Sequence, residues 1–186
     1  MKTKIIVLLV LIPAFVFAQK TRELSFGTGP SFFGWGDITG YAFSTAYTQP
    51  ISSHFGFEPR IIMSNAWRKY DASDGYSFSH TGYMGFAGSL VITPFAGRFS
   101  FFKIKSGYLY QHFLHSNGNV RTGEYYMNDS EFRIANYNGL IHTLHTRLID
   151  RERFFVGSEL SMLTNFSGGY YNCDGFILNI MAGIKF

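Results

Sequence analysis

The chain has almost no cysteine: Cys173 is the only one among its 186 residues. A single cysteine cannot form an internal disulfide, so a disulfide-stapled secreted fold is excluded. Charge is also scarce, because Asp, Glu, Lys and Arg together make up 15% of the residues. The formal net charge is +4, but the basic residues are scattered along the chain rather than clustered. The sequence therefore indicates no nucleic-acid partner.

Long apolar runs are lacking after the first residues of the chain. Residues 1–18, MKTKIIVLLVLIPAFVFA, combine two lysines with an apolar stretch that is well short of the roughly 20 residues of a spanning helix. Val16 and Ala18 fit the small-residue pattern that precedes a cleavage site, with Gln19 as the new first residue. We expect a cleaved signal peptide over 1–18 and one exported domain over 19–186.

Aromatic residues and glycine, in contrast, are abundant. Phe, Tyr and Trp make up 19% of the chain, which also holds 20 glycines. Short segments with alternating apolar residues recur throughout the exported part, which is typical of an all-β barrel or sandwich. One of them, 132–149, is long enough to contain a bulge. We expect eight strands at 24–33, 39–49, 55–66, 81–93, 99–113, 132–149, 154–165 and 174–186.

The connections between these strands alternate in length. Short turns are expected at 50–54, 94–98 and 150–153, and longer polar loops at 67–80 and 114–131. Short turns on one side and long loops on the other are typical of a barrel in the bacterial outer membrane. The connection at 34–38 is short and departs from this pattern, and 166–173 is of intermediate length.

The faces of the strands predict which residues meet lipid. Lys103 and Lys105 share one face of their strand, and each would cost roughly 2–4 kcal/mol facing lipid near the membrane midplane. They are therefore expected to face inward, which turns Phe102 and Ile104 towards lipid. An eight-stranded barrel has a narrow interior, so small and polar residues are expected to fill it. An interfacial girdle is predicted from Trp35, Tyr41, Tyr47, Trp67, Tyr83, Tyr108 and Tyr110.

The closing segment DGFILNIMAGIKF, 174–186, places apolar residues at every second position and ends on Phe186. Here the sequence resembles small bacterial outer-membrane proteins of the porin-like β-barrel family. The resemblance implies an eight-stranded antiparallel up-and-down transmembrane β-barrel, in contact with the lipid of the cell outer membrane. It also implies that the last apolar residues are a signal for the barrel-assembly machinery. The residues matching that signal are Leu178, Ile180, Ile184 and Phe186.

Charged residues on the predicted inner face form the first candidate site. Three of the strands run upward from the same side, and their charges lie four to seven residues into each strand, so they should meet at similar depth. Unpaired buried charges are strongly destabilising, which predicts mutual ion pairs. The network either closes the lumen or lines a narrow ion pathway. Its expected members are Glu58, Arg60, Lys103, Lys105, Glu159 and Arg147, with His145 near them.

The second candidate is His112, His115 and Ser116 in the segment QHFLHSNG. It is similar to the His-x-Ser-Asn pattern of lipid A deacylases, which are also eight-stranded barrels, but lacks the spacer residue. Adjacent residues of a strand point to opposite faces, so His115 could activate Ser116 only if the segment turns. No pair of histidines has convincing spacing for a metal, and no cofactor is predicted.

The leading hypothesis is a non-enzymatic outer-membrane barrel that stabilises the envelope or presents loops 67–80 and 114–131 to an extracellular partner. Three alternatives remain. A lipid A-modifying enzyme would need an aligned His–Ser–acid cluster at the lipid-exposed outer rim. A narrow-pore channel would need a continuous path through the lumen. A soluble ligand-binding barrel would need an open apolar interior.

Overall fold

The computed structural model describes residues 21–34, 38–72, 75–94, 101–121, 124–126, 132–166 and 174–186. The expected signal peptide, Trp35 and Cys173 lie outside these ranges. These described residues contain no candidate membrane-spanning helix. The strands are β1 (Glu23–Phe33), β2 (Ile38–Pro50), β3 (Phe55–Ala72), β4 (Gly75–Ile92), β5 (Phe102–Arg121), β6 (Glu124–Tyr126), β7 (Phe132–Asp150), β8 (Phe154–Asn165) and β9 (Gly175–Lys185).

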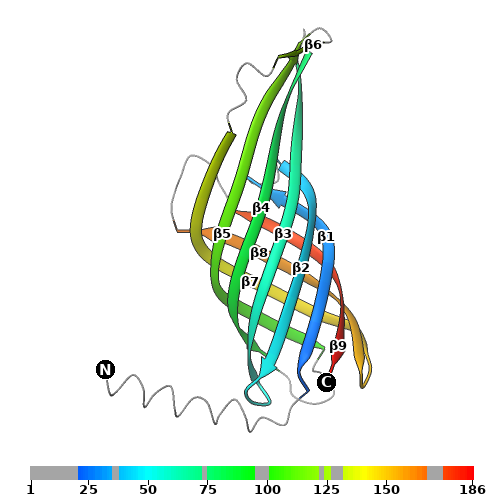
Figure 1. The fold of residues 1–186 in the computed structure, drawn as a ribbon. Coiled ribbons are helices and arrows are strands. Elements are labelled where there is room, and N and C mark those ends of the chain that lie inside the picture. Colours follow the sequence, from blue (N-terminus) through cyan, green and yellow to red (C-terminus); the bar gives the residue numbers. More distant parts are fainter. Residues whose placement is uncertain are drawn as a thin grey trace, which may run out of the picture.

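Eight of these strands form a closed antiparallel barrel (Figure 1). Each strand pairs with the next along the chain, and β1 pairs with β9 to close the ring. Following the pairs once around from Glu23 leads back to Phe33 on the same strand, a shift of 33 − 23 = 10 residues. Such a stagger requires tilted strands, as in transmembrane barrels. The predicted fold class is therefore confirmed, and the short β6 only adds to the outer end of β5.

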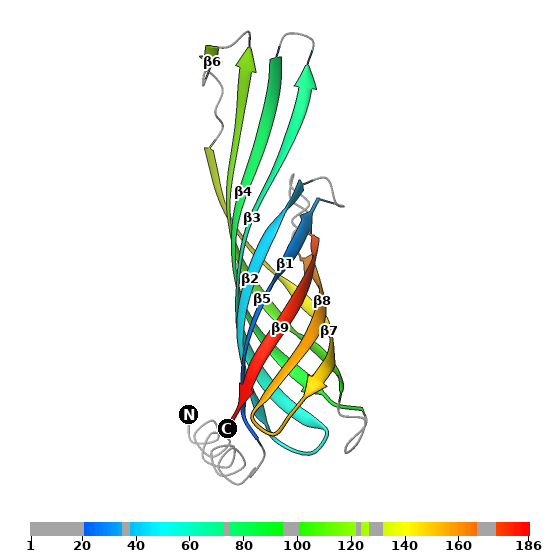
Figure 2. The ribbon, with the colours of Figure 1, turned by 90° about the vertical axis from the view of Figure 1, so that its right-hand side faces the viewer.

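Three strands extend well beyond the rest of the barrel (Figure 2). The strand β2 begins at Ile38, and its Thr39 pairs with Trp67, so the end of β3 beyond this point pairs only with β4. The prediction that 67–80 and 114–131 are loops is wrong for much of both segments, because strand β3 continues to Ala72 and β5 to Arg121. Outside a membrane both faces of a hairpin meet water, so the alternation that marks a strand disappears there.

The outer surface of the barrel is an apolar belt. Large apolar side chains are exposed on every barrel strand that the structure describes, for example Phe43 on β2, Ile61 on β3 and Leu160 on β8. Ile104, which is predicted to face lipid, is among them. The predicted girdle residues Tyr41, Tyr47, Trp67, Tyr108 and Tyr110 also lie on this outer surface. An exposed belt of this kind is stable only where hydrocarbon covers it.

A bulge interrupts the pairing of β7 with β8, as the length of the predicted strand 132–149 suggested. The register shifts between Arg147 and Ile149. The extra residue, Leu148, is among the most exposed apolar side chains of the barrel, at 75%. Arg147 keeps its inward orientation, whereas both Leu148 and Ile149 are exposed on the outer surface, because the bulge interrupts the alternation.

The interior differs from the predicted small and polar lumen. Its outer half holds four rings in contact at tilted or edge-to-face angles, Phe33, Tyr83, Phe113 and Tyr137, here called the aromatic cluster. Tyr83 is thus inside the barrel, and its assignment to the interfacial girdle is wrong. Space for its ring comes from Gly85, the next inward residue of β4, where an added Cβ would lie only 2.3 Å from the Tyr83 hydroxyl. Glycine and alanine at other inward positions make room for large side chains that the same narrow lumen could not otherwise hold.

Candidate functional site: a charged cluster in the barrel lumen

The inward charges of three strands meet beneath the aromatic cluster. Glu58 and Arg60 are consecutive inward residues of β3, and both are buried. Lys105 on β5 and Glu159 on β8 reach the same point from the other side of the barrel, because the alternation of their strands turns them inward. These four residues are called the lumen quartet.

Each cation of the lumen quartet bridges both carboxylates. The Arg60 guanidinium lies 2.7 Å from Glu58 Oε1 and 2.8 Å from Glu159 Oε2. The Lys105 ammonium lies 2.8 Å from Glu58 Oε2 and 2.5 Å from Glu159 Oε1. Two positive and two negative side chains therefore balance one another within a space that excludes most water. Their mutual attraction offsets the large cost of removing each charge from water.

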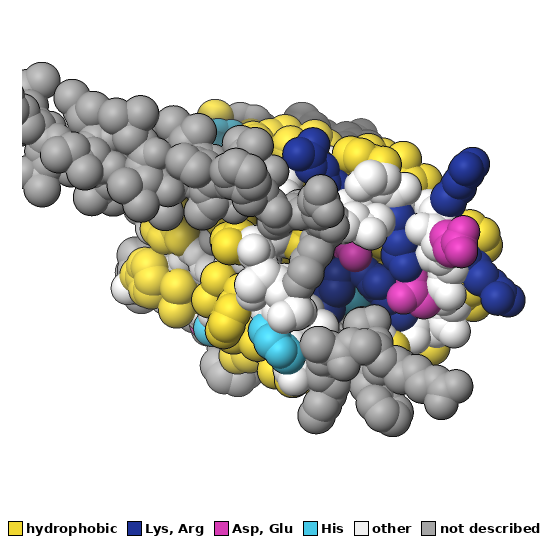
Figure 3. Space-filling view, turned by 90° about the horizontal axis from the view of Figure 1, so that it is seen from below, with side chains coloured by type: hydrophobic (Ala, Val, Ile, Leu, Met, Phe, Trp, Pro, Cys, Tyr) yellow, Lys and Arg dark blue, Asp and Glu magenta, His cyan; other side chains and the backbone are white. Residues whose placement is uncertain are grey.

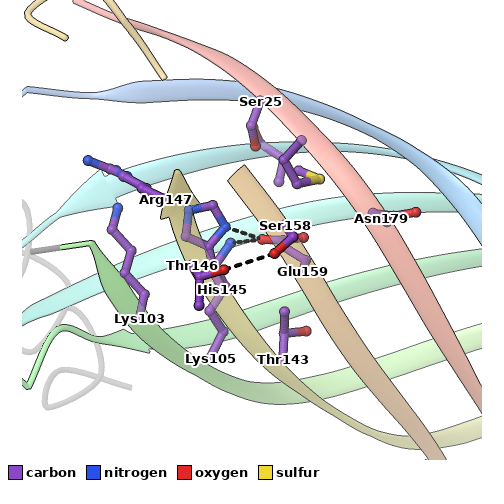
Figure 4. A network of polar contacts seen from close by, with 12 residues as sticks. Ser25, Lys103, Lys105, Thr143, His145, Thr146, Arg147, Ser158, Glu159 and Asn179 are labelled. Atoms are coloured by element: carbon purple, nitrogen blue, oxygen red, sulfur yellow. Dashed lines mark hydrogen bonds and ion pairs between the residues drawn. The ribbon is translucent and has the colours of Figure 1, made fainter. Parts of the chain in front are cut away.

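Polar neighbours complete the hydrogen bonding of the two carboxylates. The Thr48 hydroxyl donates to Glu58 Oε2 at 2.6 Å. On the other side, His145 Nδ1 lies 3.0 Å from Glu159 Oε1. Figure 4 shows Lys105 and His145 both directed at Glu159, from two neighbouring strands. The cluster is thus held by β2, β3, β5, β7 and β8 together.

A second group of charges lies closer to the end of the barrel that holds the short turns. It consists of Glu23, Lys103, Arg147, Asp150 and Lys185 and is called the mouth cluster. Lys103 Nζ lies 2.7 Å from Glu23 Oε2, and Arg147 also pairs with Glu23. Arg147 is 3.1 Å from Asp150, which Lys185 contacts in turn. Seen from below, basic and acidic side chains gather in the hollow of this mouth (Figure 3).

The structure divides the six sequence-predicted charges between two groups. Glu58, Arg60, Lys105 and Glu159 lie together in the lumen quartet, whereas Lys103 and Arg147 belong to the mouth cluster. Sequence reasoning placed His145 near them but missed Glu23, Asp150 and Lys185. Glu23 had a usable signal, because it continues the inward row of Ser25 and Gly27 by one step. Asp150 and Lys185 stand at strand ends, where alternation carries less information.

The histidine and serine candidates do not form an aligned pair. His115 lies 3.0 Å from the Thr81 hydroxyl and 3.4 Å from that of Ser79. The strand continues straight through this position, so Ser116 stands on the opposite face. His112 faces outward and lies 2.7 Å from the Asn136 side-chain oxygen. Among the described residues, no three His, Cys, Asp or Glu side chains are grouped as metal ligands would be.

The charges and rings occupy successive levels of the lumen. The mouth cluster is lowest, the lumen quartet lies above it, and the aromatic cluster occupies the outer half. Between the quartet and the rings lie buried apolar residues, including Ile62, Leu109 and Ile141. In this interior the acidic and basic side chains neutralise one another, and the apolar side chains pack together.

Comparison with known proteins finds similarity in structure but not in sequence. No family model matches the chain, and no curated protein is significantly similar to it. The crystal structure of Ail, the attachment invasion locus protein of Yersinia pestis, matches with a TM-score of 0.55 at 10% identity, covering 89% of this chain and 98% of that one. The outer membrane protein OprG of Pseudomonas aeruginosa matches with a TM-score of 0.53 at 10% identity, over 89% and 93% of the two chains.

A third match is the N-terminal β-barrel domain of OprF from Pseudomonas aeruginosa. Its TM-score is 0.51 at 9% identity, and the match covers 90% of this chain and 98% of that domain. All three solved structures are bacterial outer-membrane barrels or barrel domains. Together with the apolar belt and the closed ring of eight tilted strands, they show that this chain has the fold of the small outer-membrane β-barrels.

Proposed function

We propose that this chain is an integral outer-membrane protein without enzymatic activity, whose barrel is a closed anchor for the strands that project from it. The observation that carries this proposal is the layered filling of the lumen. The lumen quartet and the aromatic cluster occupy successive levels, so neither a water column nor a ligand cavity is expected along the axis. The outer ends of β3, β4 and β5 are then the parts that are available for contact with other molecules.

The projecting strands are suited to contact with an extracellular partner. They rise beyond the ends of β1, β2, β8 and β9 (Figure 2), and the described part of β3 exposes Trp67 at their base. The segments 67–80 and 114–131 therefore remain the proposed partner-binding region, and their described residues within β3, β4 and β5 belong to a paired sheet. This arrangement supports an interaction role, or a role in stabilising the envelope, over the transport of a solute.

A closed lumen predicts that the intact protein forms no large pore. The full exported chain, refolded and inserted into planar lipid bilayers, should show no stable large conductance, because ion pairs and packed rings fill the axis. The matched control is a refolded large porin with a water-filled lumen, measured in the same bilayers. Stable large conductance from the intact barrel would contradict the proposed function and would favour the channel alternative.

We also propose that the outward row of β9 is recognised by the barrel-assembly machinery. The backbone of Phe186 pairs with that of Arg22, at 2.8 and 3.0 Å, so the residue belongs to the seam that closes the barrel. Its ring is exposed, like those of the other proposed signal residues Leu178, Ile180 and Ile184. A residue in this position contributes little to the lumen and is accessible during insertion.

The assembly proposal predicts that Phe186→Ala lowers the outer-membrane yield in cells more than its effect on the finished barrel would suggest. Removing the ring should cost the refolded barrel at most about 1.5–3 kcal/mol, since it removes one apolar contact with lipid. The matched control is Phe176→Ala, which removes an exposed ring from the same face of the same strand. Equal yields of the two variants would show that Phe186 has no special part in assembly.

A further inference from the structure

One sector of the lipid-facing belt is unusually polar. It is formed by the outward residues of the neighbouring strands β5 and β7, which lie side by side in Figure 1. No other neighbouring pair of strands in the described part of the barrel presents as many outward imidazole, amide and phenol groups. The polar stripe consists of Ser106, Tyr108, Tyr110, His112, Asn136, Asn138 and His142.

The deepest part of the polar stripe lies within the apolar belt itself. Ser106 Oγ lies 3.0 Å from His142 Nδ1, and both residues are exposed on the outer surface. Apolar side chains border the pair on both flanks and below, and Tyr108 lies above it on the same face. The apolar neighbours of the pair are Leu90 and Met162 on the flanking strands and Ile104 and Leu144 one pair below, all of them exposed.

Three hydrogen bonds of the polar stripe cross from β5 to β7. Tyr108 donates to Asn138, and His112 lies 2.7 Å from Asn136. The Ser106 contact uses only Nδ1 of His142, and Nε2 has no hydrogen bond to any residue that the structure describes. An unsatisfied ring nitrogen in hydrocarbon is unfavourable, and polar groups in the membrane usually mark a function.

We propose that the polar stripe is the interface at which two copies of this chain pair within the membrane. The place of the Ser106–His142 pair among exposed apolar side chains favours a partner that is itself embedded in the bilayer and carries polar groups. Imidazole, amide and hydroxyl groups each both donate and accept hydrogen bonds, so the stripe is complementary to itself. A second copy therefore supplies the missing partners without any other protein.

The position of the polar stripe favours a closed pair over a longer assembly. The stripe lies on one side of the barrel, and a ring or filament would need two different contact surfaces. Two copies inserted in the same direction are related by an axis along the membrane normal, which brings equal depths together. His142 of one copy then meets Ser106 or His142 of the other, and the asparagine side chains meet at a higher level.

A cross-linking experiment tests this geometry in the full exported chain. In a Cys173→Ser background, Leu144→Cys places a thiol beside the Ser106–His142 pair without altering either residue. The matched control is Thr28→Cys on β1, which is also lipid-facing and lies on the opposite side of the barrel in strand order. Mild oxidation in phosphatidylcholine vesicles without lipopolysaccharide should convert Leu144→Cys, but not Thr28→Cys, into a disulfide-linked pair.

A second experiment measures the contribution of the polar stripe itself. His142→Leu should weaken self-association in the same vesicles about three- to fifteenfold. This is the effect of losing one side-chain hydrogen bond between transmembrane segments, as measured for membrane helices. Thr28→Leu should leave it unchanged, and both variants should still fold because neither residue points into the lumen. Three results would overturn the proposal. The barrel could stay monomeric at high protein-to-lipid ratio, the two positions could cross-link equally, or the copies could pair only in the presence of lipopolysaccharide.

Discussion

Glu159→Gln is expected to destabilise the folded barrel by about 3–5 kcal/mol, because it leaves buried cations without their counter-charge. The Glu159 carboxylate forms ion pairs with the Arg60 guanidinium at 2.8 Å and with the Lys105 ammonium at 2.5 Å. The residue is 1% exposed. Glutamine keeps the shape of the side chain but carries no charge, so one of the two cations loses its balance. Urea-induced unfolding of the refolded protein in phospholipid vesicles measures the change in the free energy of unfolding.

Two further variants separate charge balance from other causes. Glu152→Gln removes the same charge from an exposed turn and should change stability by less than about 0.5 kcal/mol. The double variant Lys105→Met with Glu159→Gln removes one cation together with one anion, leaving Arg60 paired with Glu58. It should therefore be more stable than Glu159→Gln alone. A cost below about 1 kcal/mol for Glu159→Gln would mean that water solvates the quartet.

The sequence predicts the barrel wall well because lipid makes the faces of each strand unequal. Lys103 and Lys105 cannot both face hydrocarbon, and once they are turned inward the side chains of their whole strand are assigned. The same reasoning places Glu159 inward on β8 and Ile104 outward on β5, and the structure agrees at both positions. Pairing and closure follow, since eight such strands have only one simple antiparallel order.

The same reasoning fails where the environment on the two faces is similar. Beyond Trp67, β3 pairs only with β4 and no longer borders a closed lumen. The extension of these strands therefore leaves no contrast between two faces in the sequence. Inside the lumen, single-strand patterns do not show which residues from distant strands meet. Tyr83 fits only because Gly85 leaves space beside it, and Lys103 pairs with Glu23 rather than with Glu159. Which inward residues of distant strands meet depends on the stagger of the strands around the barrel.

Phe113→Ala is expected to destabilise the barrel by about 3–5 kcal/mol, because it removes the ring at the centre of the aromatic cluster. The Phe113 ring lies 4.9 Å from Tyr83, 5.7 Å from Tyr137 and 6.0 Å from Phe33, measured between centroids. Three neighbouring rings on separate strands cannot all move into the vacated space, so a cavity remains. Urea-induced unfolding in vesicles again gives the change in stability.

Phe43→Ala is the matched control, since Phe43 faces lipid on β2 and is 63% exposed. Lipid chains can fill the space that this ring leaves, so only the transfer part of the cost, about 1.5–3 kcal/mol, should remain. The difference between the two variants then measures the cavity. Phe113→Ala should still show no large conductance, because the lumen quartet lies across the same axis at another level. Equal costs for the two variants would mean that the aromatic cluster is loosely packed, and a pore opened by Phe113→Ala alone would show that the charges do not seal the lumen.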